Sequence, residues 1–238
     1  MLPQPTATEA ESALLNAAPA CADYSRFVQR VRRRFAAECA LLPEGTPDAA
    51  QIERLIDRLL ADGRALPSAL RVARHVVIER LVVLDVECGA DLAAVTRTMT
   101  ALAEVVLERA LADALAEEDA RSGAPVDALG RCIDVWIVGM GKLGARELNV
   151  SSDIDLIYIC EDDGHTLGAS PVSTQEYFGR VAKRLHNLIG DVTDDGLVFR
   201  VDLALRPNGN SGPPVVSLSM LEEYLQVQGR EWERFAWL

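Results

Sequence analysis

The hydrophobic pattern of this chain changes near Pro125, and the change divides its 238 residues into two unlike halves. From Asp48 to about Ala120, apolar residues recur at spacings of three and four, which is typical of amphipathic helices. After Pro125 they gather in short, partly β-branched runs, which are typical of strands. The sequence therefore predicts a helical layer followed by a unit that mixes strands and helices.

Three helices are expected in the helical half. Asp48 follows a proline and is placed to cap the first helix, which an Asp-Gly pair at 62–63 ends. The second helix ends at Gly89. The third begins near Asp91 and runs to a linker at 121–125 that contains glycine and proline.

The second half alternates strands with turns and one helix. Strands are expected at 133–138, 154–160 and 198–205, with a helix at 175–189 between the second strand and the third. The order is strand, glycine turn, strand, helix, strand, which is that of an α/β unit. From about 219 another helical pattern runs to the last residue without a capping glycine or a polar tail, so the sequence looks interrupted within a helix.

The composition limits the class of protein. Hydrophobic residues make up 49% of the chain, which is enough for a large core, but no apolar run reaches the roughly 20 residues that span a bilayer. Residues 1–19 lack the basic start of a secretory signal, so we expect a cytoplasmic protein. The net charge of −12 argues against nucleic acid as a partner, and the basic run at 30–34 is expected to be a solvated helix face.

The cysteines indicate neither disulfides nor a structural zinc site. They are odd in number and far apart, with no Cys-x-x-Cys pair and no histidine at ligand spacing. We expect them to be reduced and mostly buried. They are Cys21, Cys39, Cys88, Cys132 and Cys160.

The densest chemical signal is the sequence Gly-Met-Gly-Lys-Leu-Gly at 139–144, after the first expected strand. One interpretation is a dinucleotide-binding fold, in which Glu161 at the end of the next strand would hold a ribose. That fold needs a full crossover helix between its first two strands. Only residues 145–152 separate the turn from the next strand, which is two helical turns and too short for a crossover.

The other interpretation is a metal site. Asp153 and Asp155 are alternate residues at a strand edge, so both carboxylates are expected to point the same way and share one or two divalent cations. Asp202 is the one acid in an otherwise apolar strand, where a lone carboxylate is costly unless it is paired or bound to metal. Three oxygen ligands suit Mg²⁺ with a phosphoryl substrate.

Residues around the glycine turn and beyond the third strand are expected to hold phosphate oxygens. Backbone amides and a lysine at the start of a short helix favour anions. The residues assigned to this role are Gly139, Gly141, Lys142, Gly144, Ser152 and Arg206, with Asn208 as a further donor.

Residues 139–156, with Arg-Val-Asp at 200–202, Leu-Arg-Pro at 205–207 and the segment 228–234, resemble the bifunctional glutamine synthetase adenylyltransferase and adenylyl-removing enzymes. The resemblance spans at least residues 133–238. It implies membership of the nucleotidyltransferase superfamily of DNA polymerase beta, whose pattern is a glycine turn, an Asp-x-Asp pair and a third acid on a later strand.

The resemblance implies an α+β fold in three parts. Residues 1–124 would form a helical N-terminal region, and 125–216 a polymerase beta-like nucleotidyltransferase domain with a small mixed sheet. Residues 217–238 would begin a further helical domain. Asp153, Asp155 and Asp202 would be the catalytic metal ligands.

The resemblance is to the N-terminal copy of this domain in the family enzyme, which implies a direction of reaction. That copy removes AMP from an adenylylated tyrosine of glutamine synthetase by phosphorolysis. Inorganic phosphate accepts the AMP, and ADP is released. The partner half of the family adds AMP from ATP. Glutamine synthetase and a P-II type nitrogen-regulatory protein are the implied partners.

One residue departs from the family pattern. Ala204 stands where family members tend to carry a basic residue between the third aspartate and Leu-Arg-Pro, which puts one substrate contact in doubt. A chain that only binds glutamine synthetase or a nitrogen-signalling protein, without catalysis, is therefore the alternative function.

Overall fold

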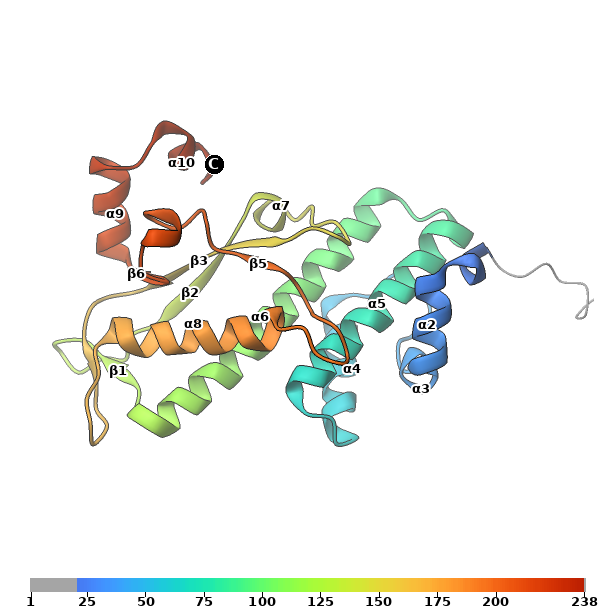
Figure 1. Cartoon of the computed structure of the whole chain (residues 1–238), viewed down its shortest axis with the longest axis horizontal. Coiled ribbons are helices and arrows are strands. Elements are labelled where there is room, and N and C mark those ends of the chain that lie inside the picture. The colour runs from blue at the N-terminus through green and yellow to red at the C-terminus, as the bar shows by residue number, and fades with distance from the viewer. Residues whose placement is uncertain (1–20, 238) are drawn as a thin grey trace, which may run out of the picture.

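Helices and a small sheet occupy opposite ends of the computed structural model, which describes residues 21–237 (Figure 1). The long helix α6 (Leu92–Ser122) runs from the helical end to the sheet. This mixture agrees with the expected α+β class. Within the described range, no helix combines the length and apolarity that crossing a membrane requires. The expectation for residues 1–19 lies outside the described residues.

The predicted helices of the first half are confirmed, with their caps. Asp48 accepts a hydrogen bond from the Gln51 backbone N–H, and the Gln51 side chain accepts one from the Asp48 N–H, which forms a capping box. Gly89 has a left-handed φ of 63° and ends the second helix, and Asp91 caps α6. The elements before α6 are η1 (Cys21–Tyr24), α2 (Arg26–Arg34), α3 (Ala36–Cys39), α4 (Ala49–Ala61) and α5 (Leu66–Cys88).

A mixed sheet forms the other end of the molecule. β2 (Val135–Met140) pairs antiparallel with β3 (Ile154–Cys160). On the other side of β3, β5 (Val201–Asp202) pairs in parallel with its beginning and β6 (Val215–Ser217) in parallel with its end. The antiparallel β2–β3 pair excludes the dinucleotide-binding interpretation and its ribose role for Glu161, because that fold begins with two parallel strands.

The third predicted strand is much shorter than expected. The backbone N–H groups of Val198 and Phe199 donate to the carbonyl of Ile189, at 3.0 and 3.3 Å, instead of to a strand. After β5, the Ala204 N–H donates to Asp202 Oδ1 at 2.7 Å, which turns the chain away from β3. Val198 and Phe199 are buried as a strand would bury them, but against the end of a helix.

Three short strands were not predicted. β1 (Pro125–Val126) and β4 (His165–Thr166) form a separate two-stranded ladder, and β6 follows a pair of prolines. Strands of two or three residues are too short to show a period of two in the sequence. β3 occupies its predicted range, whereas β2 begins two residues after the predicted start.

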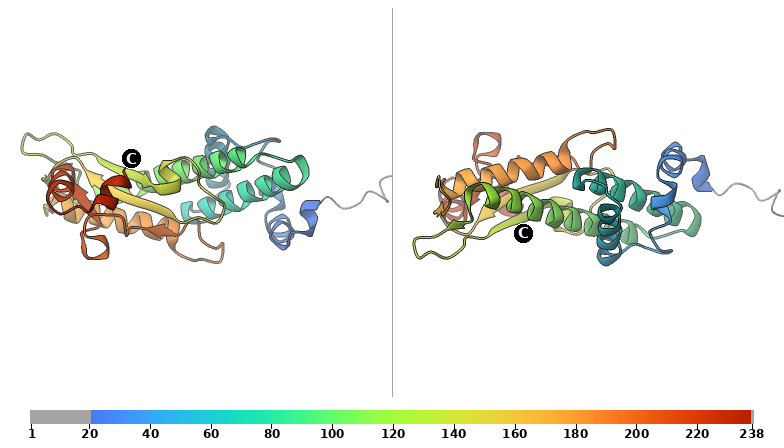
Figure 2. Two further views of the ribbon diagram at one scale, coloured as in Figure 1. Left: turned by 90° about the horizontal axis from the view of Figure 1, so that it is seen from above. Right: turned by 90° about the horizontal axis from the view of Figure 1, so that it is seen from below.

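Helix α8 (Thr174–Gly190) lies beside α6, and both pack on one face of the sheet (Figures 1 and 2). Ser173 caps α8, where its Oγ accepts a hydrogen bond from the Glu176 backbone N–H. One buried core continues from the helical end into the sheet, across the predicted boundary at 124–125. The apolar face of α8 is buried throughout, and its members are Tyr177, Phe178, Val181, Leu185, Leu188 and Ile189.

The final helical pattern forms two short helices instead of the single continuous helix predicted. α9 (Leu218–Val227) ends where the N–H groups of Gln228 and Gly229 both donate to the Tyr224 carbonyl, at 2.9 and 2.7 Å. α10 (Glu231–Phe235) follows. A Cβ at position 229 would lie 3.0 Å from the Leu225 Cα, so the turn at this break favours glycine.

All five cysteines are free, as predicted, but the expectation that most are buried is wrong. Cys160 is buried, Cys39 is half-buried, and Cys21, Cys88 and Cys132 are exposed. Cys21 and Cys88 lie at helix ends, and Cys132 lies between β1 and β2.

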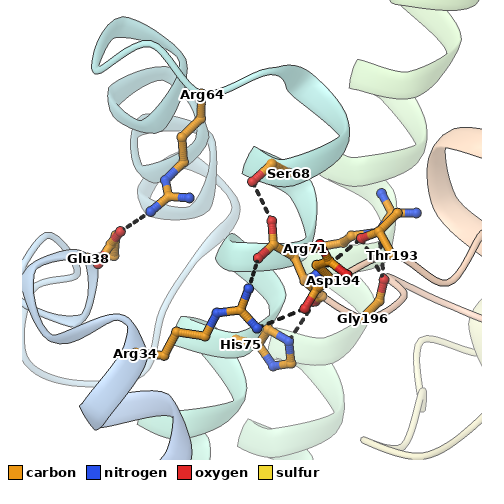
Figure 3. A network of polar contacts seen from close by, with 10 residues as sticks. Arg34, Glu38, Arg64, Ser68, Arg71, His75, Thr193, Asp194 and Gly196 are labelled. Atoms are coloured by element: carbon orange, nitrogen blue, oxygen red, sulfur yellow. Dashed lines mark hydrogen bonds and ion pairs between the residues drawn. The ribbon is translucent and has the colours of Figure 1, made fainter.

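The buried side chain of Arg71 ties the helical end to the loop that leads to β5 (Figure 3). Arg71 is 1% exposed, and it donates to the carbonyls of Gly196 at 2.8 Å, Pro67 at 2.7 Å and Leu188 at 2.8 Å, and also to that of Asp191. Three of these carbonyls belong to the end of α8 and the following loop. The guanidinium therefore satisfies backbone groups that would otherwise be buried without partners.

The same loop is held from outside by Asp195 and its neighbours. The Asp195 carboxylate accepts from Ser68 Oγ and from Arg34, each at 2.6 Å, and its carbonyl lies 3.0 Å from His75 Nε2. Arg34 also donates to the Asp194 carbonyl at 2.8 Å (Figure 3). The basic run at 30–34 is thus largely exposed, as predicted, but it also holds this loop in place.

Replacing Arg71 with leucine should destabilise the fold by about 3 kcal/mol or more, because it leaves buried carbonyls without donors. Urea denaturation monitored by circular dichroism measures this. Arg97 is exposed on α6, so Arg97→Leu is a control that should change the free energy of unfolding by less than about 0.5 kcal/mol. Equal, small effects of the two substitutions would contradict the role of Arg71.

Candidate functional site

The predicted acidic site lies on the sheet face that α6 and α8 leave uncovered. Along β3, Leu156 and Tyr158 belong to the main core, while Ile157 and Ile159 belong to a smaller cluster that also includes Leu221 of α9. Because side chains alternate along a strand, Asp155 shares the face of Ile157 and Ile159. The site is thus on the α9 side of the sheet, at the beginning of β3.

Asp155 and Asp202 lie side by side on that face. They are direct partners in the parallel β3–β5 ladder, so their side chains leave the sheet in the same direction. Asp155 is half-buried and Asp202 is exposed. The structure therefore brings these two predicted residues together, one on each of two neighbouring strands.

Asp153, the third predicted acid, has a cation for a neighbour. It lies two residues before Asp155, and Arg200 lies two residues before Asp202, so the parallel register sets Asp153 beside Arg200. The two form an ion pair, with 47% of the Asp153 side chain and 63% of the Arg200 side chain exposed. Arg200 also donates to the Ser151 carbonyl at 2.9 Å. The site is thus a set of four charged residues, three acids and one arginine.

Burial and the neighbouring carboxylates raise the cost of ionising Asp155. The pKa of Asp155 is raised, first by burial and then by the negative charges of Asp202 and Asp153. Its Oδ2 faces the glycine turn, where a Cβ added to Gly141 would lie 3.3 Å away. Gly141 has a φ of +53°, which also favours glycine. The turn therefore borders the acidic site directly.

The other two glycines of the turn have a packing role. The turn contains the single-turn helix α7 (Gly141–Gly144), which folds back onto β2. A Cβ at position 144 would lie 2.5 Å from the Gly139 carbonyl oxygen, and one at 139 would lie 2.8 Å from the Leu143 side chain. These contacts account for Gly139 and Gly144 without a ligand, and their role in phosphate binding stays a prediction.

The other residues predicted to bind phosphate differ in whether their side chains are free to contact a ligand. Lys142 is exposed and Ser152 is half-buried beside Asp153. Arg206 donates to the Leu203 carbonyl at 2.7 Å and to the Gly212 carbonyl at 3.5 Å. Arg206 thus supports the turn after β5, whereas Lys142 makes no ion pair among the described residues.

The donor set fits Mg²⁺ in part. Asp155 and Asp202 offer neighbouring carboxylate oxygens, which are the ligands that this ion prefers. Asp153 would have to exchange Arg200 for the metal in order to join them. Within residues 21–237, no group of three or more histidine, cysteine or acidic side chains is arranged as a metal site. The three-aspartate metal site therefore stays a prediction.

The sequence patterns gave no role to Arg200 or to Arg74, which lines a pocket next to the site. Arg200 had a usable signal, because it stands at the same offset from Asp202 as Asp153 does from Asp155. Arg74 had none, since it lies within a helix far away in the sequence.

Comparison with known proteins places the chain in a family. The family model of glutamate-ammonia ligase adenylyltransferases matches residues 9–238. The chain belongs to this family. Three curated relatives are each named bifunctional glutamine synthetase adenylyltransferase/adenylyl-removing enzyme.

The relatives are much longer than this chain. The protein of Burkholderia mallei is 47% identical over 226 residues, which cover 90% of this chain and 24% of the relative. That of Ralstonia nicotianae is 44% identical, covering 97% and 25%, and that of Chromobacterium violaceum is 50% identical, covering 73% and 20%. The chain thus spans about a quarter of the length of the curated relatives it matches.

Asp155→Asn should raise the melting temperature slightly, by about 1–2 °C at neutral pH in chelator. The folded state raises the pKa of Asp155, so its charge destabilises the fold above that pKa. The gain should disappear as the pH falls toward the ordinary aspartate value of about 4, where the carboxyl is protonated in both states.

The matched control is Asp153→Asn, which removes the same charge but also breaks the ion pair with Arg200. It should show no gain. Scanning calorimetry at several pH values measures both variants. A lower melting temperature for Asp155→Asn at neutral pH would show that its carboxylate is a structural hydrogen-bond acceptor.

Proposed function

We propose that this chain is the adenylyl-removing nucleotidyltransferase part of a glutamine synthetase adenylyltransferase. In this proposal, inorganic phosphate attacks AMP that is bound to a tyrosine of glutamine synthetase, and ADP is the product. The observation that supports it most is the parallel pairing of Asp155 with Asp202 beside a glycine turn. The mixed sheet is consistent with a polymerase beta-like fold, which forms part of the proposal.

The exposure of the site suits a protein substrate. Asp153 and Asp202 are exposed, and the acidic set lies on an open face of the sheet. A tyrosine on the surface of another protein can reach such a face, whereas a deep pocket would exclude it. The net charge of −12 also favours a protein partner over a polynucleotide.

The proposed chemistry is an exchange at one phosphorus atom. A phosphate oxygen forms a bond to the phosphorus of AMP while the bond to the tyrosine oxygen breaks, and that oxygen takes up a proton. Mg²⁺ bound by the aspartates would neutralise charge on the phosphoryl oxygens. In this proposal Asp202, the more exposed member of the pair, accepts the proton of the attacking phosphate, and the tyrosine oxygen takes up a proton in its place. Catalysis then rests on positioning and charge neutralisation.

Asp202→Asn should reduce ADP release from adenylylated glutamine synthetase, in the presence of Mg²⁺ and phosphate, by at least about a hundredfold. The change keeps the shape of the side chain and removes its charge. Asp85 is exposed on α5 and far from the site in the sequence, so Asp85→Asn is the control that should retain the activity.

Two results would overturn the proposal. Release of ADP by Asp202→Asn at the rate of the unmodified chain would remove the catalytic role of the pair. Binding of glutamine synthetase by the unmodified chain without any ADP release would support the binding-only alternative instead.

A further inference from the structure

A pocket next to the acidic site carries two arginines in an apolar setting. It has a volume of about 380 Å³ and lies between α2, α5 and the segments that lead into β3 and β5. Its walls include Phe27, Ile78 and Phe199. The polar groups that reach it are Arg74, Arg200, Ser151 and Ser152.

Arg74 has no carboxylate partner among residues 21–237. It donates only one hydrogen bond there, a long one of 3.3 Å to the Val150 carbonyl, and its guanidinium carbon lies 5.7 Å from the centre of the Phe199 ring. Its Nε is buried and has no hydrogen-bond partner in the described structure. A guanidinium normally fills its five donors when it is withdrawn from water, so Arg74 is incompletely satisfied.

The positive charge of Arg200 adds to the energetic cost of burying the Arg74 guanidinium. Arg200 lines the same pocket, and the pKa of Arg74 is lowered first by burial and then by the positive charge of Arg200. Arg200 is balanced by Asp153, whereas Arg74 is not balanced. Two like charges near apolar walls destabilise the protein unless an anion joins them.

We propose that this pocket binds a phosphate group through Arg74 and Arg200, with the hydroxyls of Ser151 and Ser152 as further donors. A tetrahedral phosphate presents more oxygens to four separate donors than a carboxylate does, and guanidinium groups bind it in a two-pronged manner. The apolar walls strengthen the attraction because they exclude water.

The pocket gives the proposed reaction a place for one of its phosphates. This role rests on the proposed function, but the binding itself does not. Arg200 connects the two sites, because it lines the pocket and pairs with Asp153. The bound group is either the free phosphate that attacks or a phosphate of ADP.

Calorimetric titration of the whole chain with inorganic phosphate, and separately with ADP, tests the pocket directly. Both titrations are done in chelator, so that the aspartates cannot contribute through a metal. We expect phosphate binding that Arg74→Gln and Arg200→Gln each weaken by at least about tenfold. Arg97→Gln, which removes an exposed charge elsewhere, should leave the affinity unchanged. Tighter binding of free phosphate than of ADP identifies the attacking reagent, and the reverse identifies a nucleotide phosphate.

Thermal stability separates this role from a structural one. Without phosphate, Arg74→Gln should melt at the same temperature as the unmodified chain or higher, because it removes an unbalanced charge. A clear loss of stability would instead make Arg74 a structural residue. Absence of binding by both ligands, or equal binding by Arg74→Gln, would overturn the proposal.

The two proposals fail in different ways. Arginine-dependent phosphate binding without ADP release from adenylylated glutamine synthetase would leave the pocket in place and overturn the proposed function. ADP release that Arg74→Gln leaves unchanged at limiting phosphate would overturn the role of the pocket in the reaction and leave the proposed function in place.

Discussion

The buried guanidinium of Arg71 is the interaction on which the geometry of the site depends. It joins α5 to the end of α8 and to the loop at 191–196 through three backbone carbonyls. That loop leads directly to β5, which has only two residues in register with β3. So short a strand has too few ladder hydrogen bonds to fix its own position. The helical end therefore sets where Asp202 lies, through Arg71 and the contacts of Asp195.

The helical half and the sheet are consequently interdependent. The main core passes from one into the other without interruption, and Arg74 and Arg200 border the same pocket from the two halves. Cutting the chain near residue 124 would separate the loop before β5 from Arg71, and it would also remove one wall of that pocket. The helical layer thus contributes to the site, although its sequence contains no group that suggests chemistry.

Much of the fold was predictable from the sequence where local signals agreed with tertiary packing. Asp48 begins its helix and Gly89 ends its helix, as the chemistry of each residue predicts. The strand β3 occupies its predicted range because it is long and apolar. The predicted strand at 198–205 fails because Val198 and Phe199 bury their side chains against the end of α8, and apolar content alone does not distinguish the two kinds of burial. Strand alternation predicts that Asp153 and Asp155 share one face, whereas the pairing of Asp155 with Asp202 and the ion pair of Asp153 both need the register of β5, which the sequence does not specify.

The register of β5 also explains how acidic and basic side chains can lie close together while some of their charges stay unpaired. A parallel ladder sets residues of equal offset side by side, so Asp155 meets Asp202 while Asp153 meets Arg200. A shift of β5 by one residue would turn Asp202 into the core and remove both pairs. The Asp155–Asp202 pair can therefore attract a cation. Arg74, which has no carboxylate partner among the described residues, can attract an anion. Under the two proposals, the carboxylate pair would hold the metal, and Arg74 with Arg200 would hold the phosphate.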